Sequence, residues 1–189
     1  MPANVVFVDR DGVINRDAPD YILSWAQFEF LPGSLRALAR LKSAGFTTIV
    51  VTNQSAVGRG MITPANLEGL HARMCAAIRK AGGEIRDIFH CPHHPQQNCA
   101  CRKPRPGLIL AARQRHAIDL TRACLVGDSA RDIQAARAAG VGLAVLVRTG
   151  NGAAAEKALS GRRGCPEHVA ADLAAAVDWI IVHAPHHAP

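Results

Sequence analysis

Short apolar runs of strand type alternate along this chain with segments whose apolar residues recur at helical spacing. The clearest runs are VVFV (5–8), TTIVVT (47–52), ACLVGD (123–128) and LAVLVRTG (143–150). Helical spacing is found in residues 32–45, 63–83, 107–116 and 130–140. Because a parallel strand needs a long crossover to reach its neighbour, this alternation predicts an α/β fold with a mostly parallel sheet covered by helices.

Several boundaries follow from local signals. Thr63 and Pro64 suit the N-cap and the first position of a helix. A last short strand is expected over residues 168–170, before a helix that starts at Asp172. The alanine-rich segment 150–166 is expected to be a solvated loop.

The bulk composition is that of one globular domain. The chain has 189 residues, 49% of them hydrophobic, which is enough for a substantial core. We expect that domain to span residues 1–183, with a flexible tail over 184–189. The 22 Lys and Arg residues outnumber the 15 Asp and Glu, which favours anionic partners without selecting among them. No apolar stretch is long enough for a signal peptide or a membrane span, so the sequence predicts a cytoplasmic protein.

Carboxylates follow the first strand in the stretch DRDGVIN. Asp9 and Asp11 stand one residue apart there, and GDSARD brings Asp128 to the end of a later strand. In an open parallel sheet the carboxyl ends of the strands share one rim, where Thr52 and Lys103 are also expected. Three carboxylates at one edge repel one another unless a cation lies between them, and Mg²⁺ prefers such oxygen ligands. The residues therefore predict a magnesium site.

Each of these residues also has a purely structural interpretation. Asp11 suits a turn, while Thr52, Asn53 and Asp128 suit helix caps. Asp132 lies in the first turn of the next expected helix, where a carboxylate stabilises the helix dipole, so we interpret it as a supporting residue. The functional interpretation rests on the occurrence of these residues together and in order.

The stretch CPHHPQQNCACRKP is too rich in proline to be a regular element. Within eleven residues it contains three cysteines and two histidines, namely Cys91, Cys99, Cys101, His93 and His94. Three thiolates and one imidazole form a closed tetrahedral Zn²⁺ site of the structural type, and we expect zinc to order the loop 91–105. The spacing does not separate the two histidines, and the alternative is a reduced, flexible loop with reactive thiols.

The order of the motifs resembles the haloacid dehalogenase superfamily of phosphatases. An Asp-x-Asp motif follows the first strand, Thr follows the second, Lys precedes a helix and Gly-Asp-x-x-x-Asp follows a later strand, all within residues 5–150. The resemblance implies a three-layer, Rossmann-like sandwich without a large cap. It also implies Mg²⁺-dependent hydrolysis of phosphomonoesters through an aspartyl-phosphate intermediate.

The same resemblance implies a role for each matching residue. Asp9 would be the nucleophile, and Asp11 would act as general acid and then as general base. Thr52 would bind phosphoryl oxygens and Lys103 would neutralise their charge. The magnesium ion would be held by Asp9, Asp128 and the backbone carbonyl of Asp11.

Within the superfamily, the chain is similar to phosphatases that remove the 7-phosphate of D-glycero-D-manno-heptose 1,7-bisphosphate in nucleotide-activated heptose and lipopolysaccharide core synthesis. DRDGVIN, VTNQS, CPHHP and CRKPRPG carry this similarity, which favours His93 as the fourth zinc ligand. Arg102 can bind a second phosphate with its forked guanidinium, which suits a bisphosphate. Ser129 stands where these relatives often have lysine, with Arg148 as the candidate substitute. The similarity also implies sugar contacts from Asp17, Tyr21, Asn53, Gln54 and Ser55.

Two other functions compete with this interpretation. A histidinol-phosphate phosphatase shares the zinc loop but has to recognise a cationic amine, for which Arg102 is a poor partner. A polynucleotide 3′-phosphatase, or a zinc and nucleic-acid binding module without catalysis, fits the basic charge. With only 2 Trp, 1 Tyr and 5 Phe and no basic stripe among them, the chain lacks a stacking platform. We therefore expect a sugar bisphosphate as the partner, and neither nucleic acid nor membrane. We also expect a monomer, since no strong apolar seam for a partner stands out in the sequence.

Overall fold

Six short strands form a parallel sheet in this protein, of which the computed structural model describes residues 4–161 and 164–184. Their order across the sheet is β3-β2-β1-β4-β5-β6. The strands are β1 (Val5–Val8), β2 (Thr47–Asn53), β3 (Asp87–Cys91), β4 (Cys124–Gly127), β5 (Leu143–Val147) and β6 (His168–Ala170). The winding reverses between β1 and β4, which lie side by side, and ligands of such sheets bind at this reversal.

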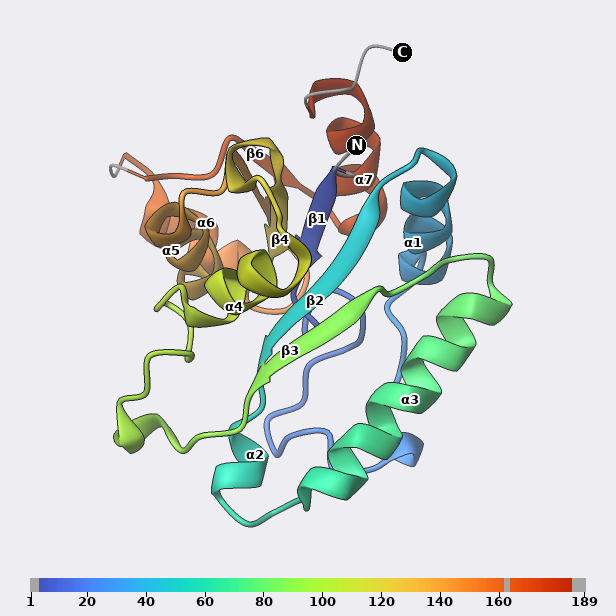
Figure 1. Ribbon diagram of the computed structural model, residues 1–189, viewed down its shortest axis with the longest axis vertical. Helices are drawn as coiled ribbons and strands as arrows, with labels where there is room; N and C mark the ends of the chain where they lie inside the picture. The colour runs from blue at the N-terminus through green and yellow to red at the C-terminus, as the bar shows by residue number, and fades with distance from the viewer. Residues whose placement is uncertain (1–3, 162–163, 185–189) are drawn as a thin grey trace.

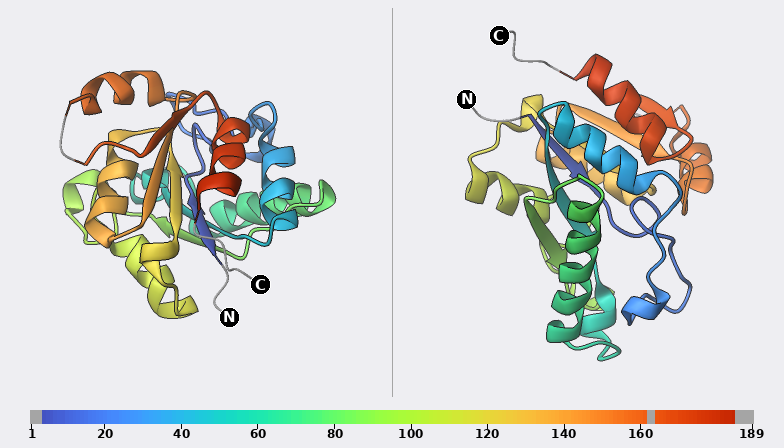
Figure 2. Two further views of the ribbon diagram at one scale, coloured as in Figure 1. Left: turned by 90° about the horizontal axis from the view of Figure 1, so that it is seen from above. Right: turned by 90° about the vertical axis from the view of Figure 1, so that its right-hand side faces the viewer.

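Helices cover both faces of the sheet and complete three layers. One face carries α1 (Ser34–Ser43), α3 (Pro64–Lys80) and α7 (Leu173–His183), and the other carries α4 (Gly107–His116), α5 (Ala130–Ala139) and α6 (Gly152–Leu159). The two sets lie on either side of the strands in Figure 1, and the left view of Figure 2 shows the layers from above. A short helix, α2 (Ser55–Gly58), follows β2. The predicted three-layer α/β fold is confirmed.

The central strands are apolar because both faces of the sheet are covered. Val6 and Val8 of β1 pack with the layer of α1, α3 and α7. Val5 and Phe7 pack with the opposite layer, as expected for side chains that alternate across a strand. The unbroken apolar run VVFV is thus explained by burial on both sides.

Side chains cap two of the helices, one at the predicted N-cap Thr63 and one at Asp172, where a helix was expected to start. The Thr63 hydroxyl accepts a hydrogen bond from the Asn66 amide, and Pro64 occupies the first position of α3. The Asp172 carboxylate accepts from the Ala175 amide at the start of α7. These bonds satisfy donors that a helix leaves unpaired at its first turn.

The expectation of a solvated loop over residues 150–166 is wrong for its first half. Gly152–Leu159 forms α6, and Ala155 and Leu159 are buried against the core. Alanine has the highest helix propensity, and a narrow apolar face is enough to dock such a segment. Residues 164–166 lie outside helices and strands.

The segment between β1 and α1 is a loop braced by aromatic side chains. It contains one short 3-10 helix, η1 (Trp25–Gln27). The ring centroids of Trp25 and Phe28 are 5.0 Å apart, as are those of Phe28 and Phe30. An isolated bridge joins Asn15 to Phe30. The predicted absence of a large cap is confirmed for the described residues.

The ends of the chain add little to this architecture. Apart from Ala184, the predicted tail lies outside the described residues, and the domain boundary at residue 183 stays a prediction. None of the helices within residues 4–161 and 164–184 has the length and apolar character needed to cross a bilayer. The large apolar side chains exposed in these ranges are Met61, Leu110 and Val182.

Candidate active site

The carboxyl ends of the strands border a polar cleft of about 360 Å³. The predicted site residues that line it are Asp9, Asp11, Asp17, Tyr21, Thr52, Asn53, Ser55, Arg102, Lys103 and Asp128. Gln54 is the predicted substrate contact that does not line it. Loops far apart in the sequence therefore meet at one sheet edge, as a parallel topology requires.

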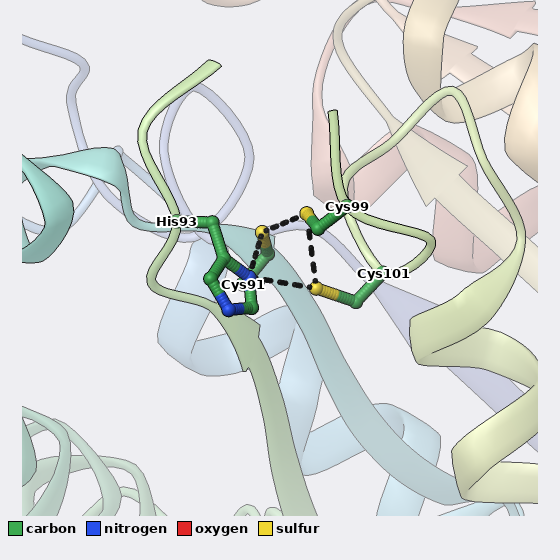
Figure 3. A group of neighbouring side chains, drawn as sticks. All are labelled: Cys91, His93, Cys99 and Cys101. Carbon is green, nitrogen blue, oxygen red and sulfur yellow. Dashed lines mark hydrogen bonds between the residues drawn. The ribbon is translucent and has the colours of Figure 1, made fainter. Parts of the chain in front are cut away.

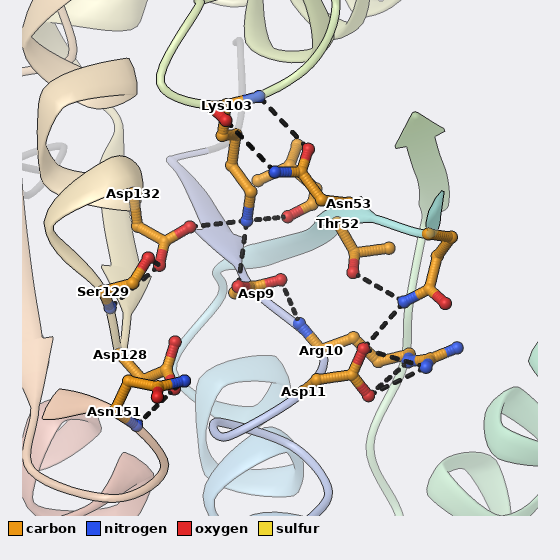
Figure 4. Close-up of polar contacts among 12 residues, drawn as sticks. Asp9, Arg10, Asp11, Thr52, Asn53, Lys103, Asp128, Ser129, Asp132 and Asn151 are labelled. Carbon is orange, nitrogen blue, oxygen red and sulfur yellow. Dashed lines mark hydrogen bonds and ion pairs between the residues drawn. The ribbon is translucent and has the colours of Figure 1, made fainter. Parts of the chain in front are cut away.

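Lys103 is buried beside β1 and binds two carboxylates. Its Nζ lies 2.9 Å from Oδ2 of Asp9 and 2.5 Å from Oδ1 of Asp132 (Figure 4). It also donates to the carbonyl of Val51 at 2.8 Å, so all three ammonium protons are engaged. Burial alone would lower the pKa of Lys103, but the two carboxylates raise it above its ordinary value. Lys103 therefore stays charged and fixes the Asp9 carboxylate.

Asp9 and Asp128 follow neighbouring strands, with the side chain of Asp9 13% exposed and Asp128 buried. Burial, together with the charges of Asp132 and Asp128, raises the pKa of Asp9 well above its ordinary range, against the opposing effect of Lys103. Burial likewise raises the pKa of Asp128 to about 6. Each carboxylate is thus stabilised in its ionised form only when a further cation is present, as expected at a metal site.

The donor set at this edge fits a hard cation such as Mg²⁺. One oxygen from each of Asp9, Asp128 and Asp132 lies within 4.8 Å of the others. Asp132 is already engaged, because Oδ1 pairs with Lys103 and Oδ2 accepts from the amide and hydroxyl of Ser129 at 3.0 and 2.5 Å. Asp9 and Asp128 are left as the carboxylate ligands, and oxygen donors suit Mg²⁺ better than softer metals.

Asp11 is held by five donor contacts. Arg10 donates three of them at 2.8 to 3.0 Å. Asn15 and Gln54 donate the other two, at 2.9 and 2.8 Å. Burial raises the pKa of Asp11, but these contacts outweigh it and lower that pKa below its ordinary value. The arrangement therefore favours the ionised carboxylate.

Arg10 is itself buried and is held from behind by His71 of α3. Its Nη1 lies 3.2 Å from Nε2 of His71. Because a guanidinium cannot accept a hydrogen bond, Nε2 is the acceptor and His71 is neutral. Burial, with Arg10 and His90 nearby, lowers the pKa of His71 to about 3. A neutral histidine thus completes the chain of contacts from α3 through Arg10 to Asp11.

The residues at the end of β2 form hydrogen bonds within the site and to the loop that contains Lys103. Gln54 donates to the Thr52 hydroxyl at 3.0 Å, which leaves the hydroxyl proton of Thr52 available to a phosphoryl oxygen. Asn53 exchanges two hydrogen bonds with the backbone of Lys103, at 3.1 and 3.2 Å. Asn53 therefore fastens the lysine loop to the sheet, and its predicted contact with a sugar stays a prediction.

The loop after β1 contributes Asp17 and Tyr21 to the cleft. Tyr21 has a φ of 64°, a left-handed conformation that is strained for a residue with a side chain. The Arg59 guanidinium lies over its ring, 5.8 Å from the centroid. Asn151 donates to Asp128 at 3.3 Å and to Asp17 at 3.4 Å, so it links this loop to the metal edge.

Arg102 lines the cleft next to Lys103 and has unused hydrogen-bonding capacity. Its Nη1 is buried and has no hydrogen-bond partner among the described residues. Arg148, the candidate substitute for a lysine at position 129, instead pairs with Glu156 at 2.7 Å and does not line the cleft. Arg102 therefore remains a candidate for binding a second phosphate, whereas Arg148 forms an ion pair with Glu156 outside the cleft.

Three thiols and one imidazole meet in the proline-rich loop (Figure 3). Sγ of Cys99 lies 3.5 Å from Sγ of Cys91 and 3.3 Å from Sγ of Cys101, and Nδ1 of His93 lies 3.2 Å from Sγ of Cys101. His94 is outside the group, since its Nδ1 accepts from the Gln96 amide. The structure thus brings His93 to the cluster, and the donor set is suited to a tetrahedral ion.

Known proteins share both the sequence and the fold. A HAD-hydrolase-like family model matches residues 100–176. A D-glycero-beta-D-manno-heptose-1,7-bisphosphate 7-phosphatase of Bordetella bronchiseptica is 42% identical over 182 residues, 95% of this chain and 99% of the relative. One of Neisseria meningitidis serogroup A is 45% identical over 165 residues, 87% of this chain and 86% of the relative. The chain belongs to this family of phosphatases.

A solved structure supports membership of this family. The crystal structure of D,D-heptose 1,7-bisphosphate phosphatase from B. bronchiseptica, complexed with magnesium and phosphate, matches with a TM-score of 0.90 and 40% identity. The match covers 96% of this chain and 99% of that one. The resemblance to haloacid dehalogenase phosphatases, and the prediction of a phosphatase, are confirmed.

Sequence reasoning missed several residues that the structure brings to the site. Arg10 had a signal, because a cation between the two aspartates of DRDG is placed to pair with one of them. His71 had none, since it occupies a buried position of α3 that periodicity assigns to the core. Asn151 also gave no signal. Asp132, predicted as a supporting residue of α5, in addition pairs with Lys103.

The close approach at Gly12 gives a test of the metal edge. Gly12 has a φ of 78°, and a β-carbon there would overlap the Asp128 carboxylate. Gly45 has a φ of 81° with open space around it, so Gly45→Ala is the matched control. Both variants lose about 1 kcal/mol of stability from backbone strain. Gly12→Ala alone should weaken Mg²⁺ activation, by about tenfold or more, in a Mg²⁺ titration of phosphatase activity. Equal Mg²⁺ dependence in the two variants would contradict this account.

The neutral state of His71 predicts a pH-dependent stability. Its pKa is about 3 in the folded protein and 6.5 ordinarily, so the unfolded chain takes up the proton first as the pH falls. The contribution of neutral His71 to the free energy of unfolding is complete above pH 6.5, and it is lost progressively as the pH falls toward 3. Lowering the pH from about 7.5 to about 5 should therefore lower the free energy of unfolding by about 2 kcal/mol through this residue.

The variant His71→Gln isolates this effect, because a glutamine oxygen can still accept from Arg10. Denaturant unfolding at the two pH values should show a flatter pH dependence for His71→Gln than for the wild-type protein. Parallel pH dependences would show that His71 is not held neutral in the folded protein.

Proposed function

We propose that this phosphatase hydrolyses the 7-phosphate of D-glycero-beta-D-manno-heptose 1,7-bisphosphate, in the synthesis of activated heptose for the lipopolysaccharide core. The single observation that carries the proposal is the pair formed by Lys103 and Asp9 at the rim of the sheet, with Asp128 beside it and Arg102 free to bind a second phosphate. The family relationship to proteins named for this reaction supports the choice of substrate.

Asp9 and Asp128, with the backbone carbonyl of Asp11, would hold Mg²⁺. When bound, the ion supplies positive charge that neutralises the nucleophile and the phosphoryl oxygens and orients them for in-line attack. Lys103 lowers the pKa of Asp9 against the effect of burial and fixes the orientation of its carboxylate, and the charge of the ion would complete the stabilisation of the ionised form. Thr52 donates its hydroxyl proton to a phosphoryl oxygen.

The reaction proceeds in two displacements at phosphorus. A carboxylate oxygen of Asp9 attacks, the bond to the sugar oxygen breaks, and the departing alkoxide takes a proton from Asp11. Asp11 then removes a proton from a water molecule that attacks the aspartyl phosphate, which releases phosphate and restores Asp9. Because five donor contacts favour the ionised form of Asp11, its carboxylate must first take up a proton, from solvent or from a phosphate hydroxyl of the bound substrate, and lose some of these contacts before the first displacement.

The cluster of Cys91, His93, Cys99 and Cys101 would hold a structural Zn²⁺. The short distances between its donor atoms and the absence of an open ligand position among them support this assignment. Zinc would replace the regular hydrogen bonds that a proline-rich loop lacks, and this loop leads directly into Arg102 and Lys103. The zinc site would thereby position both cations at the cleft.

We also propose that the chain acts as a monomer in the cytoplasm. Free cysteines arranged as a metal cluster, rather than as disulfides, are typical of a reducing compartment. Large exposed apolar side chains are few and scattered in the described ranges, so they form no evident subunit interface.

The nucleophile is tested with Asp9→Asn. This change keeps the shape of the side chain but removes the attacking anion, so turnover of the heptose bisphosphate with Mg²⁺ should fall below detection. The control is Asp178→Asn, which alters an exposed carboxylate of α7 and should retain activity. A panel of both heptose bisphosphate anomers, histidinol phosphate and a 3′-phosphorylated oligonucleotide tests the substrate. Preferred cleavage of histidinol phosphate, or turnover by Asp9→Asn, would overturn the proposal.

The zinc assignment is tested by elemental analysis of protein purified without chelators. The wild-type protein should contain about one zinc per chain. Cys99→Ala and Cys101→Ala should lose it, together with thermal stability, because binding is coupled to the folding of the loop. The control Cys165→Ala removes an exposed thiol outside the cluster and should keep its zinc. A wild-type protein without zinc would contradict the assignment.

A further inference from the structure

The cleft contains three cations with very different surroundings. They are Arg102, Lys103 and Arg131. Lys103 is buried, and its ammonium group contacts Asp9, Asp132 and a backbone carbonyl. It cannot therefore also bind the far end of a substrate. The two arginines are the cations that remain along the cleft lining.

Arg102 and Arg131 are brought to the same rim by the buried ion pair between their neighbours. Arg102 directly precedes Lys103, and Arg131 directly precedes Asp132. Because Lys103 and Asp132 are 2.5 Å apart, the lysine loop and the start of α5 are held together at this point (Figure 4). The two arginines therefore come from segments that meet at this contact, and both line the cleft.

Neither arginine forms an ion pair with a carboxylate within the described part of the chain. Arg131 is exposed, with no ion pair or hydrogen bond from its side chain, and Arg102 has a buried Nη1 without a hydrogen-bond partner. Elsewhere on the surface, arginines pair with glutamates, as Arg137 does with Glu167 and Arg148 with Glu156. Two uncommitted guanidinium groups on one polar cleft form a site for an anion.

The position of Arg131 is locally unfavourable for its helix. Arg131 lies in the first turn of α5, where the partial positive charge of the helix end repels a cation. Asp132 is the residue of that turn that suits the dipole. A residue that opposes a local rule without a compensating contact is a candidate for function.

The charge of the cleft favours a role at a second phosphate. Its lining includes five carboxylates, from Asp9, Asp11, Asp17, Asp128 and Asp132. A bound Mg²⁺ and Lys103 offset only part of that charge, and they lie at the reacting phosphoryl group. A bisphosphate would bring a second dianion to the cleft, and it needs cations away from the metal.

We infer that Arg131 is a specificity-determining residue that binds, together with Arg102, the phosphate that is not hydrolysed. This inference rests on the proposed function, since it assigns the second phosphate of the same substrate. The two guanidinium groups, one from the lysine loop and one from α5, would bind oxygens of the same phosphate. They would thereby fix the orientation of the substrate as well as add to its affinity.

The test compares a bisphosphate with a monophosphate. Arg131→Ala should lower kcat/KM for the heptose bisphosphate about tenfold more than it lowers kcat/KM for p-nitrophenyl phosphate, mainly through KM. Arg131→Lys keeps the charge but loses the fork, and should recover part of the preference. The control Arg36→Ala, an exposed arginine of α1 that does not line the cleft, should leave the preference unchanged. An unchanged preference in Arg131→Ala, or an equal loss in Arg36→Ala, would overturn the inference.

A binding experiment separates this inference from the identity of the substrate. Mannose 1-phosphate is titrated calorimetrically into protein that holds Mg²⁺ and inorganic phosphate, which fill the reacting position. The dissociation constant should rise about tenfold in Arg131→Ala. If the wild-type enzyme prefers another phosphomonoester but this rise is observed, the proposed function fails and the anion site stands. If the constant is unchanged, the anion site is excluded whatever the substrate.

Discussion

The buried pair between Lys103 and Asp9 is the interaction on which the rest of this site depends. A lysine at 2% exposure is stable only if its charge is matched, and Asp9 and Asp132 supply that match. Removing either partner would leave an uncompensated buried charge, which costs several kcal/mol. The pair with Asp9 therefore joins the lysine loop to the end of β1 and gives Asp9 a fixed orientation, and the pair with Asp132 joins the same loop to α5.

This arrangement explains why an enzyme of this kind places its charges at a sheet edge. Hydrolysis of a phosphate monoester is among the slowest uncatalysed reactions, and its acceleration comes mainly from positioning and electrostatics. Asp9 and Asp128 extend from adjacent strands that are hydrogen-bonded along their length, so their separation is set by the sheet. A rigid scaffold can hold opposing charges at close range without reorganising when the substrate arrives.

Much of the fold and the site could be predicted from the sequence, because the information was local. VVFV, the caps at Thr63 and Asp172, and the carboxylates after β1 each follow from residue type and spacing within one segment. The contact between Arg10 and His71 spans 61 positions along the chain, and no local pattern marks it. The helix α6 was missed because glycines at both ends of the segment, Gly150, Gly152, Gly161 and Gly164, are typical of loops. The helix propensity of its short alanine-rich core is decisive only once its apolar face is buried.

The central claim is that Asp9 carries the phosphoryl group during turnover. The direct measurement is mass spectrometry of the enzyme quenched within milliseconds of mixing with Mg²⁺ and heptose bisphosphate, followed by borohydride, which reduces an acyl phosphate to an alcohol. We predict that the peptide containing Asp9 carries homoserine at that position, while Asp11 in the same peptide is unchanged. Homoserine at another aspartate, or its absence while the enzyme turns over, would contradict the account.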